Sequence, residues 1–195
     1  MMRRRRTLVL PLTGLLAAGV LVGGCSAKSD EAVAWAGAEC TAVANVYLSS
    51  RLLASLVPEA SGIDDASLAL FQARLGDAVS AVSDAVIRES QQLQSAPGEL
   101  ADAIAPIQGA SAAVSDSMQK SGTALGALAG APDASAADAA APAAITAAND
   151  VRDSATALAT AVAEVTAAND TFQAAPYCAS TFSDPASLPT AVPSS

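Results

Sequence analysis

The stretch "LADAIAPIQGASAAVSDSMQKSGTALGALA", residues 100–129, decides the fold of this 195-residue chain. Its apolar and small residues recur at alternating steps of four and three positions, which places them on one face of an α-helix. They are Leu100, Ile104, Ile107, Ser111, Val114, Met118, Ser121, Leu125 and Leu128. A helix with such a face buries it against other helices, so this stretch predicts a helical bundle.

Three further segments repeat apolar residues at helical spacing: 30–57, 65–95 and 143–175. Breaks near Pro58 and Pro97 separate the first three helices. Short connections make neighbouring helices antiparallel, so we expect an all-α, up-down-up-down four-helix bundle. Alanine supplies 50 of the 195 residues, which implies closely packed helices and a thin core.

Two segments of the chain are expected to lie outside the helices. Residues 130–142, "GAPDASAADAAAP", have the composition of a linker between the third and fourth helices. Residues 183–195 contain three prolines and few apolar residues, so we expect a disordered tail. The bundle domain is therefore predicted over residues 30–182.

The first 30 residues have the layout of a secretory signal peptide, with four arginines at 3–6 and an apolar stretch at 8–22. That stretch is shorter than the roughly 20 residues that span a bilayer comfortably. It ends in Val22-Gly23-Gly24-Cys25, which resembles the lipobox of bacterial lipoproteins. A common signal peptide with an incidental cysteine is the alternative, and the route of export, by the general or the twin-arginine pathway, stays open.

The resemblance to bacterial lipoproteins implies a processing site and a location. The cut would fall between Gly24 and Cys25, and the Cys25 thiol would carry a diacylglycerol. Residues 1–24 would then be the signal peptide and 25–29 a lipidated tether. The resemblance implies a protein held by its lipid at the extracytoplasmic face of the cell membrane, where two acyl chains give stable attachment.

Charge restricts the partners of the exported part. The residues after Gly24 carry six basic and 19 acidic side chains, a net charge of −13. Nucleic acids and anionic lipid surfaces repel such a protein, so we expect no nucleic-acid partner and no membrane contact through the protein face. The short tether would keep one end of the bundle near the bilayer, and we expect partner contacts at the membrane-distal end or flank.

Cys40 and Cys178 are the two cysteines that remain after Cys25. An even pair in an exported chain predicts a disulfide, with two free buried thiols as the alternative. In the expected topology the first and last helices share an end, and the chain after Pro176 must fold back along the first helix to bring the cysteines together. A metal site is disfavoured, because the chain has no histidine and two thiolates do not complete a tetrahedral shell.

The chain contains few residues that could carry catalytic chemistry. Without histidine, the Ser-His and Cys-His nucleophile pairs are excluded, and we predict no catalytic, metal or cofactor site. Carboxylates remain as candidates at Asp64-Asp65, at Asp150 with Asp153, and at Asn169-Asp170. The sequence "TAAND" occurs at 146–150 and 166–170 and could suggest a calcium site, but 20 helical residues turn by about 200°, so the copies face nearly opposite ways and are better explained as solvated helix surface.

The sequence favours a non-enzymatic surface lipoprotein that binds or spaces another cell-envelope protein. The alternative is a ligand or lipid carrier with a cavity between the helices, which a kink at Pro106 could open at one end. A carboxylate-based hydrolase is a more distant third.

Overall fold

The computed structural model describes residues 29–184. This range folds into helices without strands. The four long helices are α1 (Asp30–Leu56), α2 (Asp65–Gln94), α3 (Ala101–Ala129) and α4 (Ala134–Ala168). Short 3₁₀ turns at Val57–Ala60 and Gly98–Leu100 precede α2 and α3, and the short helices α5 (Asp170–Ala174) and α6 (Pro176–Thr181) follow α4.

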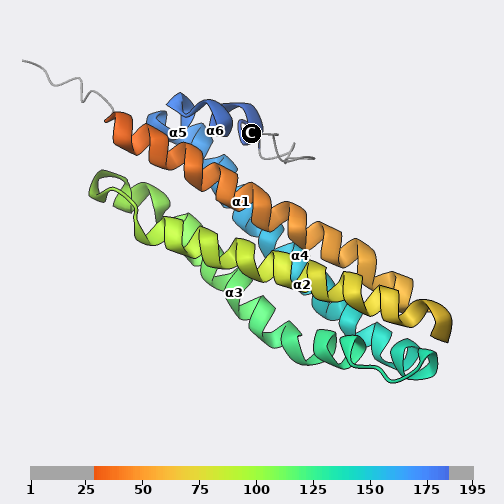
Figure 1. Cartoon of the computed structure of the whole chain (residues 1–195). Coiled ribbons are helices and arrows are strands. Elements are labelled where there is room, and N and C mark those ends of the chain that lie inside the picture. The colour runs from red at the N-terminus through yellow and green to blue at the C-terminus, as the bar shows by residue number, and fades with distance from the viewer. Residues whose placement is uncertain (1–28, 185–195) are drawn as a thin grey trace, which may run out of the picture.

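The long helices form the predicted up-down-up-down bundle. Helix α1 packs against α2 and α4, and α3 packs against α2 and α4, so each helix touches its two neighbours around a shared core. Figure 1 shows the start of α1 at one end of an elongated molecule, with α5 and α6 beside it, and the turn from α1 to α2 at the opposite end.

The heptad face of α3 lies in the core as predicted. Its apolar and serine positions are buried, apart from the partly buried Met118. Ser121 is accommodated because its hydroxyl donates to the Ala147 carbonyl of α4 at 3.0 Å. Small side chains at this seam let the two helices approach closely.

The predicted linker at 130–142 is wrong for most of its length, because α4 begins at Ala134. Asp133 caps the helix by accepting from the Ala136 amide at 2.8 Å, and Asp65 of α2 accepts from the Ala134 amide at 2.7 Å. Pro142 therefore lies inside the helix. Its cost is offset by alanines with high helix propensity, three of which, Ala137, Ala141 and Ala144, are fully buried.

The predicted fourth helix also ends earlier than residue 175. Asn169 adopts an extended conformation, and its side chain accepts from the amides of Thr171 and Phe172, which starts α5. The chain then turns back, and both α5 and α6 pack against α1. This fold-back is the arrangement that the Cys40–Cys178 pairing required.

The helical stretch Asp30–Ala60 is long and apolar enough to cross a membrane, by length and composition alone. Half of its most apolar window is buried inside the bundle, where Val43, Val46 and Leu53 are fully covered. Core helices of folded domains share this composition, so the stretch is accounted for by the bundle.

Candidate functional site

Two of the predicted site residues come together at the proximal half of the bundle, the half that contains the start of α1. Cys40 of α1 and Cys178 of α6 form a disulfide with an S–S distance of 2.04 Å and a Cα–Cα distance of 5.4 Å. Both cysteines are fully buried. The disulfide therefore confirms the predicted pairing. The other two predicted site residues, Gly24 and Cys25, lie outside the described residues, as does the predicted tail from residue 185 onward.

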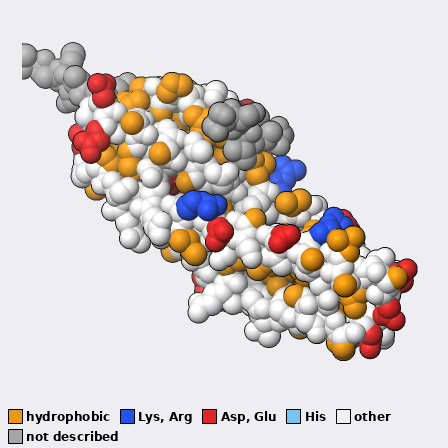
Figure 2. All heavy atoms as spheres, in the orientation of Figure 1, with side chains coloured by type: hydrophobic (Ala, Val, Ile, Leu, Met, Phe, Trp, Pro, Cys, Tyr) orange, Lys and Arg blue, Asp and Glu red, His pale blue; other side chains and the backbone are white. Residues whose placement is uncertain are grey.

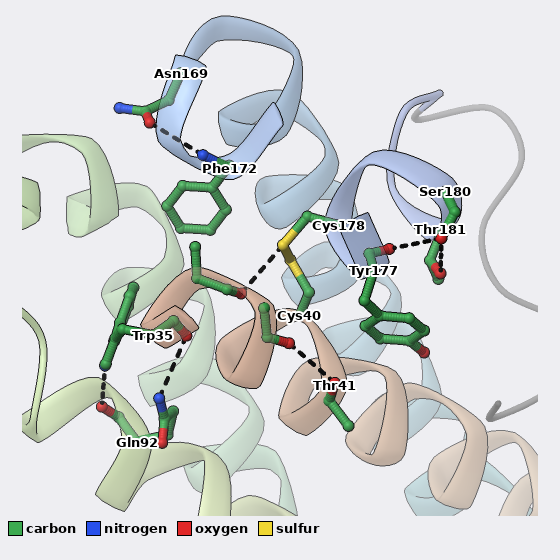
Figure 3. Close-up of a disulfide and its surroundings, with 12 residues drawn as sticks. Trp35, Cys40, Thr41, Gln92, Asn169, Phe172, Tyr177, Cys178, Ser180 and Thr181 are labelled. Carbon is green, nitrogen blue, oxygen red and sulfur yellow. Dashed lines mark hydrogen bonds between the residues drawn. A yellow bond between two sulfur atoms is a disulfide. The ribbon is translucent and has the colours of Figure 1, made fainter. Parts of the chain in front are cut away.

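Aromatic side chains pack around the disulfide (Figure 3). Trp35 of α1 meets Phe172 of α5 edge to face, with ring centroids 6.2 Å apart. The Trp35 indole N–H donates to the Gln92 carbonyl of α2 at 3.0 Å, so this ring ties three helices together. Tyr177 lies on the other side of the disulfide.

Two glutamates that were not among the predicted site residues lie inside the same half of the bundle. Glu39 of α1 is fully buried, and Glu89 of α2 is 1% exposed. The Trp35–Gln92 hydrogen bond shows which residues of these antiparallel helices lie side by side. Glu39 lies four residues after Trp35 on α1, and Glu89 lies three residues before Gln92 on α2. The two glutamates are therefore level with each other. We call these residues the carboxyl pair.

The carboxyl pair has few hydrogen bonds. The Ser111 hydroxyl of α3 donates to Glu89 Oε2 at 2.5 Å. Neither carboxyl oxygen of Glu39 has a hydrogen-bond partner, nor does Glu89 Oε1. Three buried carboxyl oxygens are thus unpaired, which is costly for a charged group.

Burial governs the ionisation of the carboxyl pair. Loss of hydration raises the pKa of Glu39 from 4.5 to about 9, and the neighbouring Glu89 charge adds to the rise. Burial raises the pKa of Glu89 to about 7, against the opposing effect of the Ser111 hydrogen bond. Near neutral pH the Glu39 carboxyl is therefore protonated, whereas Glu89 titrates.

The sequence did contain a signal for the carboxyl pair. Glu39 occupies a step of the buried stripe between Ala36 and Val43, and Glu89 occupies a step between Ala85 and Leu93. A carboxylate on an apolar stripe is buried if the helix forms. The search for acidic residues adjacent in sequence missed both, because they come from different helices.

Two of the carboxylates that the sequence did single out, Asp64 and Asp65, accept hydrogen bonds from backbone amides at helix starts. Asp64 accepts from the Ser67 amide at the start of α2, and hydrogen bonding by the Ser67 side chain, together with that amide, lowers the pKa of its exposed carboxyl. Asp153 pairs with Arg152 at 2.8 Å on the surface of α4. The two "TAAND" copies begin 20 residues apart, which is about 30 Å along the helix axis, and they form no joint site. Among the described residues no group of three or more acidic, cysteine or histidine side chains could hold a metal.

An apolar groove lies between α1 and α2 near the distal end, the end that contains the α1–α2 turn. It has a volume of about 340 Å³. We call it the distal groove. It is lined by Leu52, Leu56, Ala78 and Ala81, with Arg74 and Asp77 completing its wall.

Two leucines near this groove are unusually exposed. Leu52, in its wall, is 60% exposed, and Leu70 is 68% exposed. Leu70 precedes Asp77 by two helical turns and therefore lies on the same face of α2. Figure 2 shows one face of the molecule, where charged side chains are few and are separated by apolar and neutral atoms.

Comparison of the chain with known protein families, with curated proteins and with solved structures gave no match.

Proposed function

We propose that this protein is an exported lipoprotein, anchored by Cys25 at the extracytoplasmic face of the cell membrane, that acts without catalysis by binding another envelope protein. The observation that carries this proposal is the buried Cys40–Cys178 disulfide. Structural disulfides form and persist in oxidising compartments outside the cytosol. Export fits the basic and apolar N-terminus, and the cysteine after Gly24 then has a role as the lipid carrier.

The start of α1 supports a bundle held close to the bilayer. Ser29 caps α1 by accepting from the Ala32 amide at 3.1 Å, and its hydroxyl donates to Glu99 at the base of α3. Only residues 26–28 separate this anchored cap from Cys25. Four Cα–Cα steps reach at most about 15 Å, so the proximal end lies near the headgroups.

The distal groove supports a protein partner. Leu52 follows the start of α1 by 22 residues, which places the groove about 33 Å farther from the anchor. Contiguous apolar surface with a polar rim marks protein contact sites, and Arg74 and Asp77 border the apolar wall of this groove. The acidic surface disfavours anionic lipid as the occupant, so we assign the groove to a protein with an apolar anchor side chain.

The carrier alternative has weaker support. A hollow of about 340 Å³ does lie beside Pro106, between α3 and α4. It is an open surface groove lined by Ala103, Val165 and Ala168, with Glu164 and Asn169 at its edge. Such a groove covers little of a lipid chain, and the core beneath it is filled by side chains.

A photo-crosslinking amino acid at Leu70 tests the proposed partner surface. In intact cells, we expect one dominant adduct with an envelope protein, because Leu70 is exposed on the face of α2 that borders the distal groove. The matched control is the same substitution at Ile87, which is 52% exposed on another face of α2. Addition of Leu52→Lys to the Leu70 probe should reduce the adduct at least tenfold.

Equal crosslinking from Leu70 and Ile87, or an adduct that Leu52→Lys leaves unchanged, would contradict the assignment of the distal groove. Abundant adducts with lipid in place of protein would instead favour the carrier alternative.

A further inference from the structure

The carboxyl pair is enclosed by helices that offer it no cation. The buried polar residues of the described chain are Glu39, Ser50, Glu89, Ser111, Ser121 and Thr166, without a lysine or arginine. From α3, the group that faces the pair is the Ser111 hydroxyl. From α5 and α6 no basic residue is available, since their sequences are DTFQA and PYCAST.

Helix α4 faces the pair with apolar side chains. The hydroxyls of Ser117 and Ser154 meet at 2.6 Å, which sets the register of the antiparallel helices α3 and α4. Ser111 lies six residues before Ser117 on α3, so on the antiparallel α4 it is level with residue 160, six residues after Ser154. The buried residues there are Leu158, Ala159 and Val162.

The charged groups on the same and neighbouring helices point elsewhere. Arg88 lies in the wall of an outer groove with Thr41 and Asn45. Arg51 stacks over the Tyr47 ring, three turns along α1 from Glu39. On α3, Lys120 pairs with Asp116 on the surface, and on α4, Arg152 pairs with Asp153 while Glu164 is exposed.

We propose that Glu39 and Glu89 form a proton-binding pair that makes the packing of α1 against α2 sensitive to pH. Two carboxylates in one buried site repel each other and lose their hydration, so the folded protein keeps them neutral by holding protons. Removal of these protons charges the α1–α2 seam in the proximal half of the bundle. The seam then loosens or admits water.

Ser111 gives the carboxyl pair a route to solvent. Its side chain donates to Glu89 and also lines an outer groove between α2 and α3, together with Ser90, Gln94 and Gln108. Protons can therefore exchange at Glu89 without unfolding of the bundle. Glu39 lies behind it and has no hydrogen-bonded link to the surface.

The sign of the pH dependence follows from whether the folded or the unfolded chain binds more protons. The pKa values of the pair are raised to about 9 and about 7 in the folded protein, against 4.5 for an ordinary glutamate. The folded chain therefore holds more protons than the unfolded chain above about pH 4.5. The stability contributed by the neutral pair is present in full below that pH and is lost as the pH rises through 7 toward 9.

Protons fit the site better than a metal ion does. The pair supplies two carboxylates and one serine hydroxyl, which already donates to Glu89. Divalent cations such as Ca²⁺ take six or more oxygen ligands, and no third acidic side chain of the described residues joins the site. A metal-dependent effect is nevertheless an outcome that the experiment distinguishes.

The test is the thermal midpoint of the mature protein as a function of pH. For the wild type, we expect a fall of about 10 °C or more between about pH 5 and pH 8, since the folded chain holds protons that the unfolded chain has lost, on Glu39 over this whole range and on Glu89 up to about pH 7. The Glu39→Gln/Glu89→Gln variant keeps the shape of the protonated pair without the titration. Its midpoint should exceed that of the wild type at about pH 8 and change much less with pH.

The matched control is Glu31→Gln/Glu164→Gln, which makes the same two chemical changes at exposed positions of α1 and α4. It should follow the wild-type pH dependence. If the buried double variant fails to fold, carboxyl ¹³C shifts of the wild-type glutamates replace it, and two carboxyls should titrate above about pH 6.

Three results would overturn the proposal. The first is a pH dependence that the buried double substitution leaves unchanged, and the second is titration of every glutamate below about pH 5. The third is a wild-type thermal midpoint that Ca²⁺, Mg²⁺ or Mn²⁺ raises while the midpoint of the double variant does not respond. The last result would assign the carboxyl pair to a cation.

Discussion

Replacement of Cys40 and Cys178 by alanine is expected to lower the free energy of unfolding by about 2–5 kcal/mol. The disulfide joins residues 138 positions apart and so restricts nearly the whole unfolded domain. The chain-entropy model gives about 5 kcal/mol for such a loop, and residual structure in the unfolded chain reduces this figure. Because the core is built largely from alanine, its other interactions compensate little for the loss of the disulfide.

Urea unfolding of the mature protein measures this effect. The wild type treated with reductant under denaturing conditions and then refolded is the control, since it lacks the disulfide but keeps both side chains. Both reduced wild type and the Cys40→Ala/Cys178→Ala variant should unfold at lower urea than the oxidised protein. Coincident unfolding curves for the oxidised and reduced proteins would show that the disulfide contributes nothing to stability.

Phe172→Ala is expected to cost about 3–5 kcal/mol, the usual range for removal of a buried phenylalanine ring. Phe172 is fully buried and is the one buried side chain of α5. Its loss leaves a cavity against Trp35 and frees α5 from the bundle, although the disulfide still holds α6. Phe172→Leu fills most of that cavity and should cost much less.

The fluorescence of Trp35, the single tryptophan, reports this change directly. In Phe172→Ala, the emission should shift toward that of a solvated indole before global unfolding, and the urea midpoint should fall. A Phe172→Ala protein with wild-type emission and a loss below about 1 kcal/mol would mean that the ring does not anchor α5 to α1.

The fold was predictable from sequence where apolar spacing is regular. The steps of four and three from Leu100 to Leu128 placed α3, and short breaks at Pro58 and Pro97 gave antiparallel neighbours. The start of α4 was not predictable by composition, because Pro142 and Gly130 suggested a linker. The alanine run is helical because Asp133 caps it and its small side chains pack against the other helices.

The candidate site was predictable in part. The disulfide followed from an even number of cysteines and the bundle topology. The carboxyl pair could not be predicted in this way. It forms because the buried stripes of two separate helices face each other and because Ser111 of a third helix contacts Glu89. Each apolar stripe alone indicates that its own glutamate is buried, but not that the two glutamates meet. Their shared burial becomes visible once the register of α1 and α2 is known.

The central claim, a lipid anchor on Cys25, is tested most directly by the mass of the N-terminal peptide of the mature chain from the membrane fraction. We predict a peptide that begins at Cys25 and carries the added mass of a diacylglycerol. The Cys25→Ser protein, which offers no thiol for the thioether, is the control and should yield no lipidated peptide. An unmodified N-terminus at another residue, or a Cys25→Ser protein of mature size that still fractionates with membranes, would contradict the account.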